Sequence, residues 1–164
     1  MSLESQFVKQ IHSLLTNVTS IVADCHDNKI TTMSPDEVNF VRGMVSEDKA
    51  QVLLDAFIND GHAHWEKAWF KNSEFATNEM PKIFEEHFDA RVLAVPFKCL
   101  AELKKGISGF SDPDSWPVIE DDITAMWVLV GNLIRIAIRY AVANESRYPG
   151  VGAANYAMKF GIAV

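Results

Sequence analysis

The chain has 164 residues, of which 48% are hydrophobic and 23% charged, and its formal net charge is −7 at pH 7. This length corresponds to one domain, so we predict a single helical domain over residues 1–164. An acidic chain without a long basic cluster repels nucleic acid and anionic membranes, and we expect neither as a partner. Cys25 and Cys99 are the only cysteines, too far apart for a zinc motif, which indicates buried thiols and a cytoplasmic location.

The first half of the chain is predicted to form helices. Apolar residues recur every seven positions over 4–26, which is typical of one broad helical face. Ser34 and Pro35 form a typical helix start, and about three turns should follow them. Another helix is expected from Ser46, interrupted or ended by Gly61.

Proline and glycine divide the next part. Thr77 and Pro81 are expected to open a helix. Pro96 should kink or break it, because proline has no amide hydrogen to donate. Gly106 should end its second half, and residues 108–117 should form a loop.

A long apolar helix is predicted near 118–144, followed by a last short helix. No segment shows the sustained period-two alternation of a strand. We therefore predict an all-α fold, a single-domain bundle of six to seven helices.

Polar residues on the long helix are confined to one stripe: Asp121, Asn132, Arg135 and Arg139. A membrane span would need about twenty residues nearly free of charge, so we expect this helix to lie in the core of a soluble domain. The two arginines could line a solvent-facing edge or bind an anion or carboxylate in a cleft. They could also pair internally with Glu85, Glu86 or Asp89.

The stretch GHAHWEKAWFKN, residues 61–72, is the most unusual in the chain. His62, Trp65 and Trp69 share one helical stripe, and an aromatic stripe usually fills a core. The alternative is a ligand pocket on this segment and the long helix, formed by His62, Trp65, Trp69, Arg135 and Arg139.

A metal site is a weaker possibility. His62 and Glu66 are four residues apart, which suits a pair of metal ligands on a helix. A matching pair from a facing helix is required. The available candidate, His87, adjoins two glutamates that point in other directions, so we predict no metal.

Haem or another tetrapyrrole is a further alternative, with His62 or His64 and His87 flanking the ring. The segment RVLAVPFKCL, 91–100, resembles the globin sequence after the haem-ligating histidine. The resemblance covers about ten residues, and the earlier globin signatures are missing, so no family is assigned and no cofactor is predicted.

No catalytic motif is present, so the chain is not expected to be an enzyme. We expect a non-catalytic protein that acts by protein–protein recognition or regulation, with a second copy of itself as a partner in a homodimer. The alternative function is a globin-like or bundle-type domain that binds haem, another tetrapyrrole, a metal or a small anion.

Overall fold

The structure, a computed structural model, describes residues 1–26, 34–71, 79–86, 88–109 and 116–164. These ranges contain eight α-helices and no strand, so the all-α prediction is confirmed, with more helices than the six to seven expected. The α-helices are α1 (Leu3–His26), α2 (Pro35–Gly43), α3 (Ala50–Asn59), α4 (Trp65–Trp69), α6 (Met80–Glu85), α7 (Ala94–Gly109), α8 (Trp116–Ala143) and α9 (Ala153–Phe160). Short 3₁₀ helices are η1 (Glu47–Lys49), η2 (His62–His64), η3 (Phe88–Leu93) and η5 (Glu145–Arg147).

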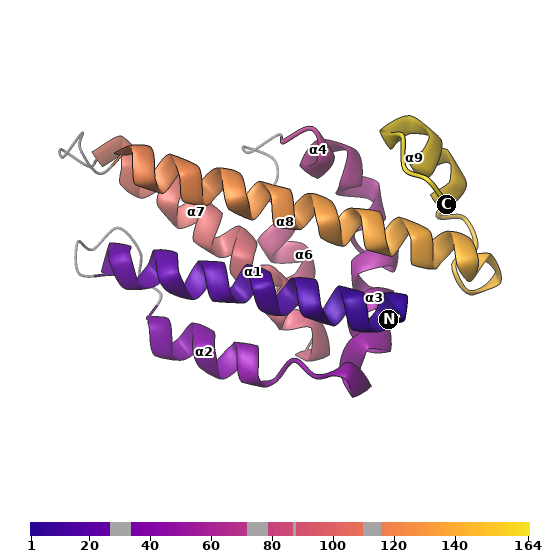
Figure 1. Cartoon of the computed structure of the whole chain (residues 1–164), viewed down its shortest axis with the longest axis horizontal. Coiled ribbons are helices and arrows are strands. Elements are labelled where there is room, and N and C mark those ends of the chain that lie inside the picture. The colour runs from indigo at the N-terminus through magenta and orange to yellow at the C-terminus, as the bar shows by residue number, and fades with distance from the viewer. Residues whose placement is uncertain (27–33, 72–78, 87, 110–115) are drawn as a thin grey trace.

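Helices α1 and α8 form the centre of the bundle. They run antiparallel and side by side, with α2 beside α1, α7 behind α8, and α9 against the C-terminal half of α8 (Figure 1). The seven-residue repeat of α1 forms its inner face, where Phe7, Leu15 and Val22 are fully buried. Each such side chain stabilises the fold by about 1.5–3 kcal/mol through its removal from water.

The long apolar helix predicted near 118–144 is present as α8. The structure starts α8 at Trp116 and ends it at Ala143. It is the only described helix long and apolar enough to cross a membrane, and 56% of that apolar window is buried inside the protein. Its polar stripe lies at the surface, where Asp121 and Arg135 are exposed.

Two predicted helix boundaries are wrong. Pro96 does not break a helix, because α7 begins at Ala94 and the proline lies in its first turn. An amide there has no helical acceptor to lose, so proline is tolerated. Gly106 does not end α7, which continues to Gly109. The predicted start at Thr77 and most of the loop at 108–117 lie outside the described residues.

The predicted start of α2 is confirmed. The Ser34 hydroxyl oxygen accepts a hydrogen bond from the Glu37 amide at 3.2 Å, and Pro35 occupies the first turn. Ser46 does not cap an α-helix in this way. Its hydroxyl donates to the Asp48 carboxylate, and a 3₁₀ turn precedes α3.

A polar cluster ties the turn after α8 to α3. The Arg147 guanidinium donates two hydrogen bonds to Asp55, at 3.1 and 2.7 Å, and the Tyr148 hydroxyl donates a third at 2.6 Å. Gln51 donates a fourth at 3.0 Å and accepts one from the Tyr140 hydroxyl at 2.7 Å. The Asp55 carboxylate therefore accepts four hydrogen bonds and holds the turn after α8 against α3.

Partial burial raises the pKa of Asp55, but the hydrogen bonds from Arg147, Tyr148 and Gln51 outweigh it, and the net pKa lies below the usual value. Burial, and next the Asp55 carboxylate, raise the pKa of Tyr148 well above its ordinary range. Both groups therefore stay in the forms that pair, anionic and neutral, at pH 7.

Candidate functional site

The aromatic segment begins at Gly61, where the chain turns tightly after α3. A Cβ at this position would collide with the carbonyl oxygen of Phe57 and lie 3.3 Å from the ring of Phe84. Only glycine fits so close an approach. The sequence predicts one continuous helix here. The structure instead has a 3₁₀ turn followed by the five-residue α4.

Trp65 fills the core at the base of this segment. Its side chain is 0% exposed and lies between the Phe57 and Tyr156 rings, with centroid distances of 6.0 and 5.3 Å. The His62 ring approaches it edge-on at 6.3 Å. The contacts of Trp65 are those of a core residue.

Trp69 and the two arginines lie further out. Trp69 stacks on Phe160 with the ring centroids 4.8 Å apart, and the Arg135 guanidinium lies 5.5 Å from the Trp69 ring. The Nε of Arg139 donates a hydrogen bond to the Ala163 carbonyl at 3.1 Å. Arg135 and Arg139 therefore border α4 and the C-terminal segment, and Arg135 makes a cation–π contact there. Internal pairing was one of the options left open by the sequence; neither arginine forms an ion pair with Glu85 or Glu86, and the side chain of Asp89 lies outside the described residues.

Helix α9 covers the polar groups of the same segment. The Tyr156 hydroxyl donates to the His62 carbonyl at 2.8 Å. The Lys159 ammonium and the Glu66 carboxylate form an ion pair at 2.7 Å. Two buried ring nitrogens, His62 Nδ1 and Trp65 Nε1, have no hydrogen-bond partner among the described residues. An unpaired buried group costs about 1–3 kcal/mol, which the surrounding ring contacts must offset.

The metal alternative gains no support from these contacts. Glu66 is paired with Lys159, and the described residues contain no group of three histidine, cysteine or carboxylate side chains placed to hold an ion. His87 lies outside the described residues. Burial, and next the positive charge of Lys67, lower the pKa of His64, so its imidazole is neutral at pH 7.

The structure thus connects His62, Trp65, Trp69 and Arg135 through ring and cation–π contacts, and α9 of the same chain packs on the aromatic rings. Arg139 contacts the C-terminal segment instead. Sequence reasoning missed this role of α9. Tyr156 and Phe160 are four residues apart on a short helix, so they lie on the same face. This spacing in the sequence could have indicated that α9 has an aromatic face.

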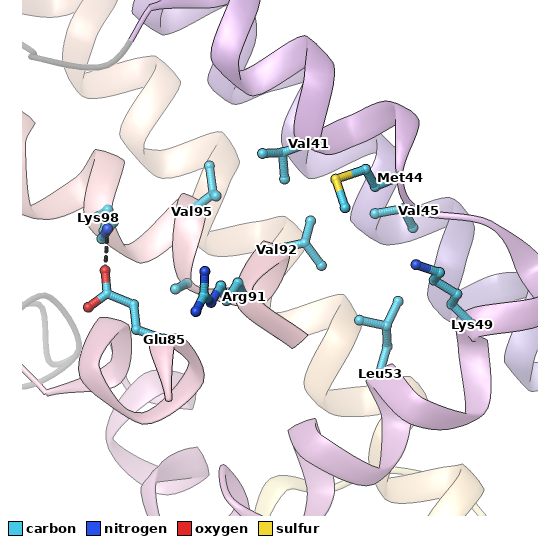
Figure 2. A pocket seen from close by; sticks show the side chains of 11 residues that line it. Val41, Met44, Val45, Lys49, Leu53, Glu85, Arg91, Val92, Val95 and Lys98 are labelled. Atoms are coloured by element: carbon cyan, nitrogen blue, oxygen red, sulfur yellow. Dashed lines mark ion pairs between the residues drawn. The ribbon is translucent and has the colours of Figure 1, made fainter. Parts of the chain in front are cut away.

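A second candidate site is a groove between α2 and α7, which we call the α2–α7 groove. Its volume is about 470 Å³. Figure 2 shows aliphatic side chains from both walls pointing into it, with Val92 near its middle. The lining residues are Val41, Met44, Val45, Lys49, Leu53, Glu85, Arg91, Val92, Ala94, Val95 and Lys98.

Charged side chains lie at the two ends of the groove (Figure 2). At one end, Lys98 forms an ion pair with Glu85, and Arg91 lies beside them. At the other end is Lys49, whose ammonium makes no hydrogen bond or ion pair of 4 Å or less with any residue that the structure describes. Cationic groups therefore border an apolar groove in a protein of net charge −7.

This groove could not be predicted from the sequence, because its walls come from segments up to fifty-seven residues apart, Val41 to Lys98. Each of those segments reads as an ordinary amphipathic helix. The groove is the space left between α2 and α7, which do not pack directly against each other there. Leu53 forms part of its lining and is 1% exposed.

Comparisons with known proteins leave the site to be interpreted from its own geometry. No protein-family model, no curated protein and no solved structure matches this chain.

Proposed function

We propose that this protein acts by recognition rather than by catalysis, and that the α2–α7 groove is its recognition site. The observation that carries the proposal is an aliphatic groove of about 470 Å³, with a lysine at one end that forms no ion pair within 4 Å with the residues the structure describes. Ligand sites in proteins commonly measure about 300–1,000 Å³ and combine apolar walls with a few placed polar groups. The ligand that fits has an apolar body and a negative charge.

The charge distribution supports an anionic ligand. The chain as a whole repels anions, since its net charge is −7. Lys49, Arg91 and Lys98 make the groove locally cationic. An anion is therefore attracted to this place on the protein over others, and added salt should weaken the attraction.

The apolar anion 1-anilinonaphthalene-8-sulfonate tests the site. We expect Val92→Asp to weaken its binding more than tenfold, because a carboxylate in the middle of the groove repels the probe and is costly to desolvate. The measurement is a fluorescence titration. The matched control is Val128→Asp, which places the same change on the exposed face of α8.

The control variant should bind the probe as the wild type does. Circular dichroism and thermal melting of all three proteins establish that they are folded, since loosely packed states also bind this dye. Equal binding by the wild type and Val92→Asp would contradict the proposal.

A second candidate function is self-association through α2. Phe40 on this helix and Met44, the residue directly after the helix, are four residues apart, with 73% and 51% of their surface exposed. If two copies pair α2 antiparallel about a two-fold axis, each Phe40 packs on the partner helix. Asp36 and Glu37 at the start of α2 then face Arg42 at the end of the other copy's α2. The small apolar area predicts weak, micromolar association.

Light scattering after size-exclusion chromatography tests this pairing. At rising micromolar concentration, the average mass of the wild type should increase from monomer toward dimer. Phe40→Ser should stay monomeric, because the main apolar contact is lost. Met158→Ser, an equally exposed apolar change on α9, should behave as the wild type. A wild type that stays monomeric throughout would rule out the dimer.

A further inference from the structure

We propose that the occupant of the α2–α7 groove is a free single-chain aliphatic carboxylate, a fatty acid, with its carboxylate on Lys49. This inference rests on the proposed function, because it names the ligand class of the same site. Neither the sequence motifs nor the comparisons point to it. The shape and chemistry of the lining residues carry it.

The walls of the groove favour an alkyl chain. The apolar lining residues are valine, leucine, alanine and methionine, and none of the lining side chains that the structure describes is aromatic. Planar ligands such as nucleobases and haem are usually held by aromatic or imidazole side chains, whereas methylene groups need only apolar contact. Val92 and Val95 lie along the middle of the groove and supply that contact (Figure 2).

The ends of the groove fix the direction of the ligand. Lys49 forms no ion pair of 4 Å or less with the described residues, and the Asp48 carboxylate beside it attracts it only at longer range, so a ligand carboxylate can supply a direct partner. At the opposite end the Lys98 ammonium is already paired with Glu85, and Arg91 beside them has an interaction of its own. The Glu85 carboxylate repels a second carboxylate there. The acid group therefore lies on Lys49, and the chain extends toward Val95.

Isothermal titration with sodium octanoate, decanoate and dodecanoate, each below its micelle concentration, tests the alkyl chain. We expect the dissociation constant to fall about fourfold for each added methylene, the equivalent of about 0.8 kcal/mol, until the chain outgrows the groove. 1-Decanol should bind more weakly than decanoate, because it lacks the charge that Lys49 attracts.

Two variants locate the ligand. Lys49→Gln should weaken decanoate binding about tenfold and leave 1-decanol binding unchanged. Lys9→Gln makes the same change on the exposed face of α1 and should have no effect on either ligand. Val92→Asp should weaken the binding of both ligands, because both chains cross the middle of the groove.

The failures are distinguishable. If the sulfonate dye binds in a Val92-dependent manner but affinity for the carboxylates does not rise with chain length, the fatty-acid inference is wrong and the recognition site stands. A steep chain-length dependence that Val92→Asp leaves unchanged would place the chains elsewhere and also overturn the inference. If 1-decanol binds as tightly as decanoate, or Lys49→Gln has no effect, the assigned carboxylate position is wrong. If neither dye nor carboxylates bind, both proposals fail.

Discussion

Replacing Trp65 by alanine is expected to lower the free energy of unfolding by about 3–5 kcal/mol. The side chain is fully buried between Phe57 and Tyr156, so its removal leaves a cavity that the neighbouring rings cannot fill without moving. Urea denaturation followed by circular dichroism measures the change. A protein of this size could be left only marginally stable by such a loss.

Phe70→Ala is the matched control, because this aromatic residue belongs to the same segment but is exposed. It should change the stability by less than about 0.5 kcal/mol. A Trp65→Ala variant as stable as the wild type would show that Trp65 is not a core residue, and the alternative of a ligand pocket at this position would gain support.

Replacing Asp55 by asparagine is expected to lower the free energy of unfolding by about 2 kcal/mol at pH 7, because the charged acceptor of four hydrogen bonds is lost. The pKa of Asp55 is lower in the folded chain than in the unfolded chain. Its stabilising effect is therefore complete above the unfolded value of about 3.9 and is lost as the pH falls through the folded value.

The stability difference between the wild type and Asp55→Asn should therefore be constant near neutral pH and shrink below about pH 4. Urea midpoints measured from pH 3 to pH 7 test this. The control is Asp36→Asn on α2, an exposed carboxylate near a helix start, which should cost only about 0.3–1 kcal/mol. A difference between wild type and Asp55→Asn that persists unchanged at pH 3 would contradict the assigned role of the carboxylate.

The fold class could be predicted from the sequence because the signals for helices, apolar periodicity and helix-start residues, depend on residues close together in the chain. The seven-residue repeat of α1 and the Ser34-Pro35 start of α2 depend on neighbours within a few residues, and both are confirmed. The predicted helix boundaries at Pro96 and Gly106 are wrong for a related reason. A proline is compatible with the first turn of a helix, and a glycine lowers helix stability without forbidding it, so neither residue alone fixes a boundary.

The candidate sites could be predicted only in part. His62 contacts Trp65, and Arg135 contacts Trp69. Helical spacing suggested a shared stripe for His62, Trp65 and Trp69, but it could not show that Arg135 of another helix lies against it. The sequence could not show that α9 covers them, because that contact joins segments about ninety residues apart. The α2–α7 groove depends on contacts of the same long range. Helical periodicity shows which face of a helix is apolar but not which neighbour leaves that face uncovered.

The two walls of the groove differ in stiffness. Among the described residues, α2 makes most of its helix contacts with α1, and Val38 is its one fully buried side chain, whereas α7 packs against α6, α1 and η3. A peripheral helix with few buried contacts opens at a lower free-energy cost than one fixed in the core. We therefore expect small displacements of α2, more than of α7, to change the width of the groove. A molecule that bridges the two walls would restrict those displacements, and part of its binding energy would be spent on ordering the helix it touches.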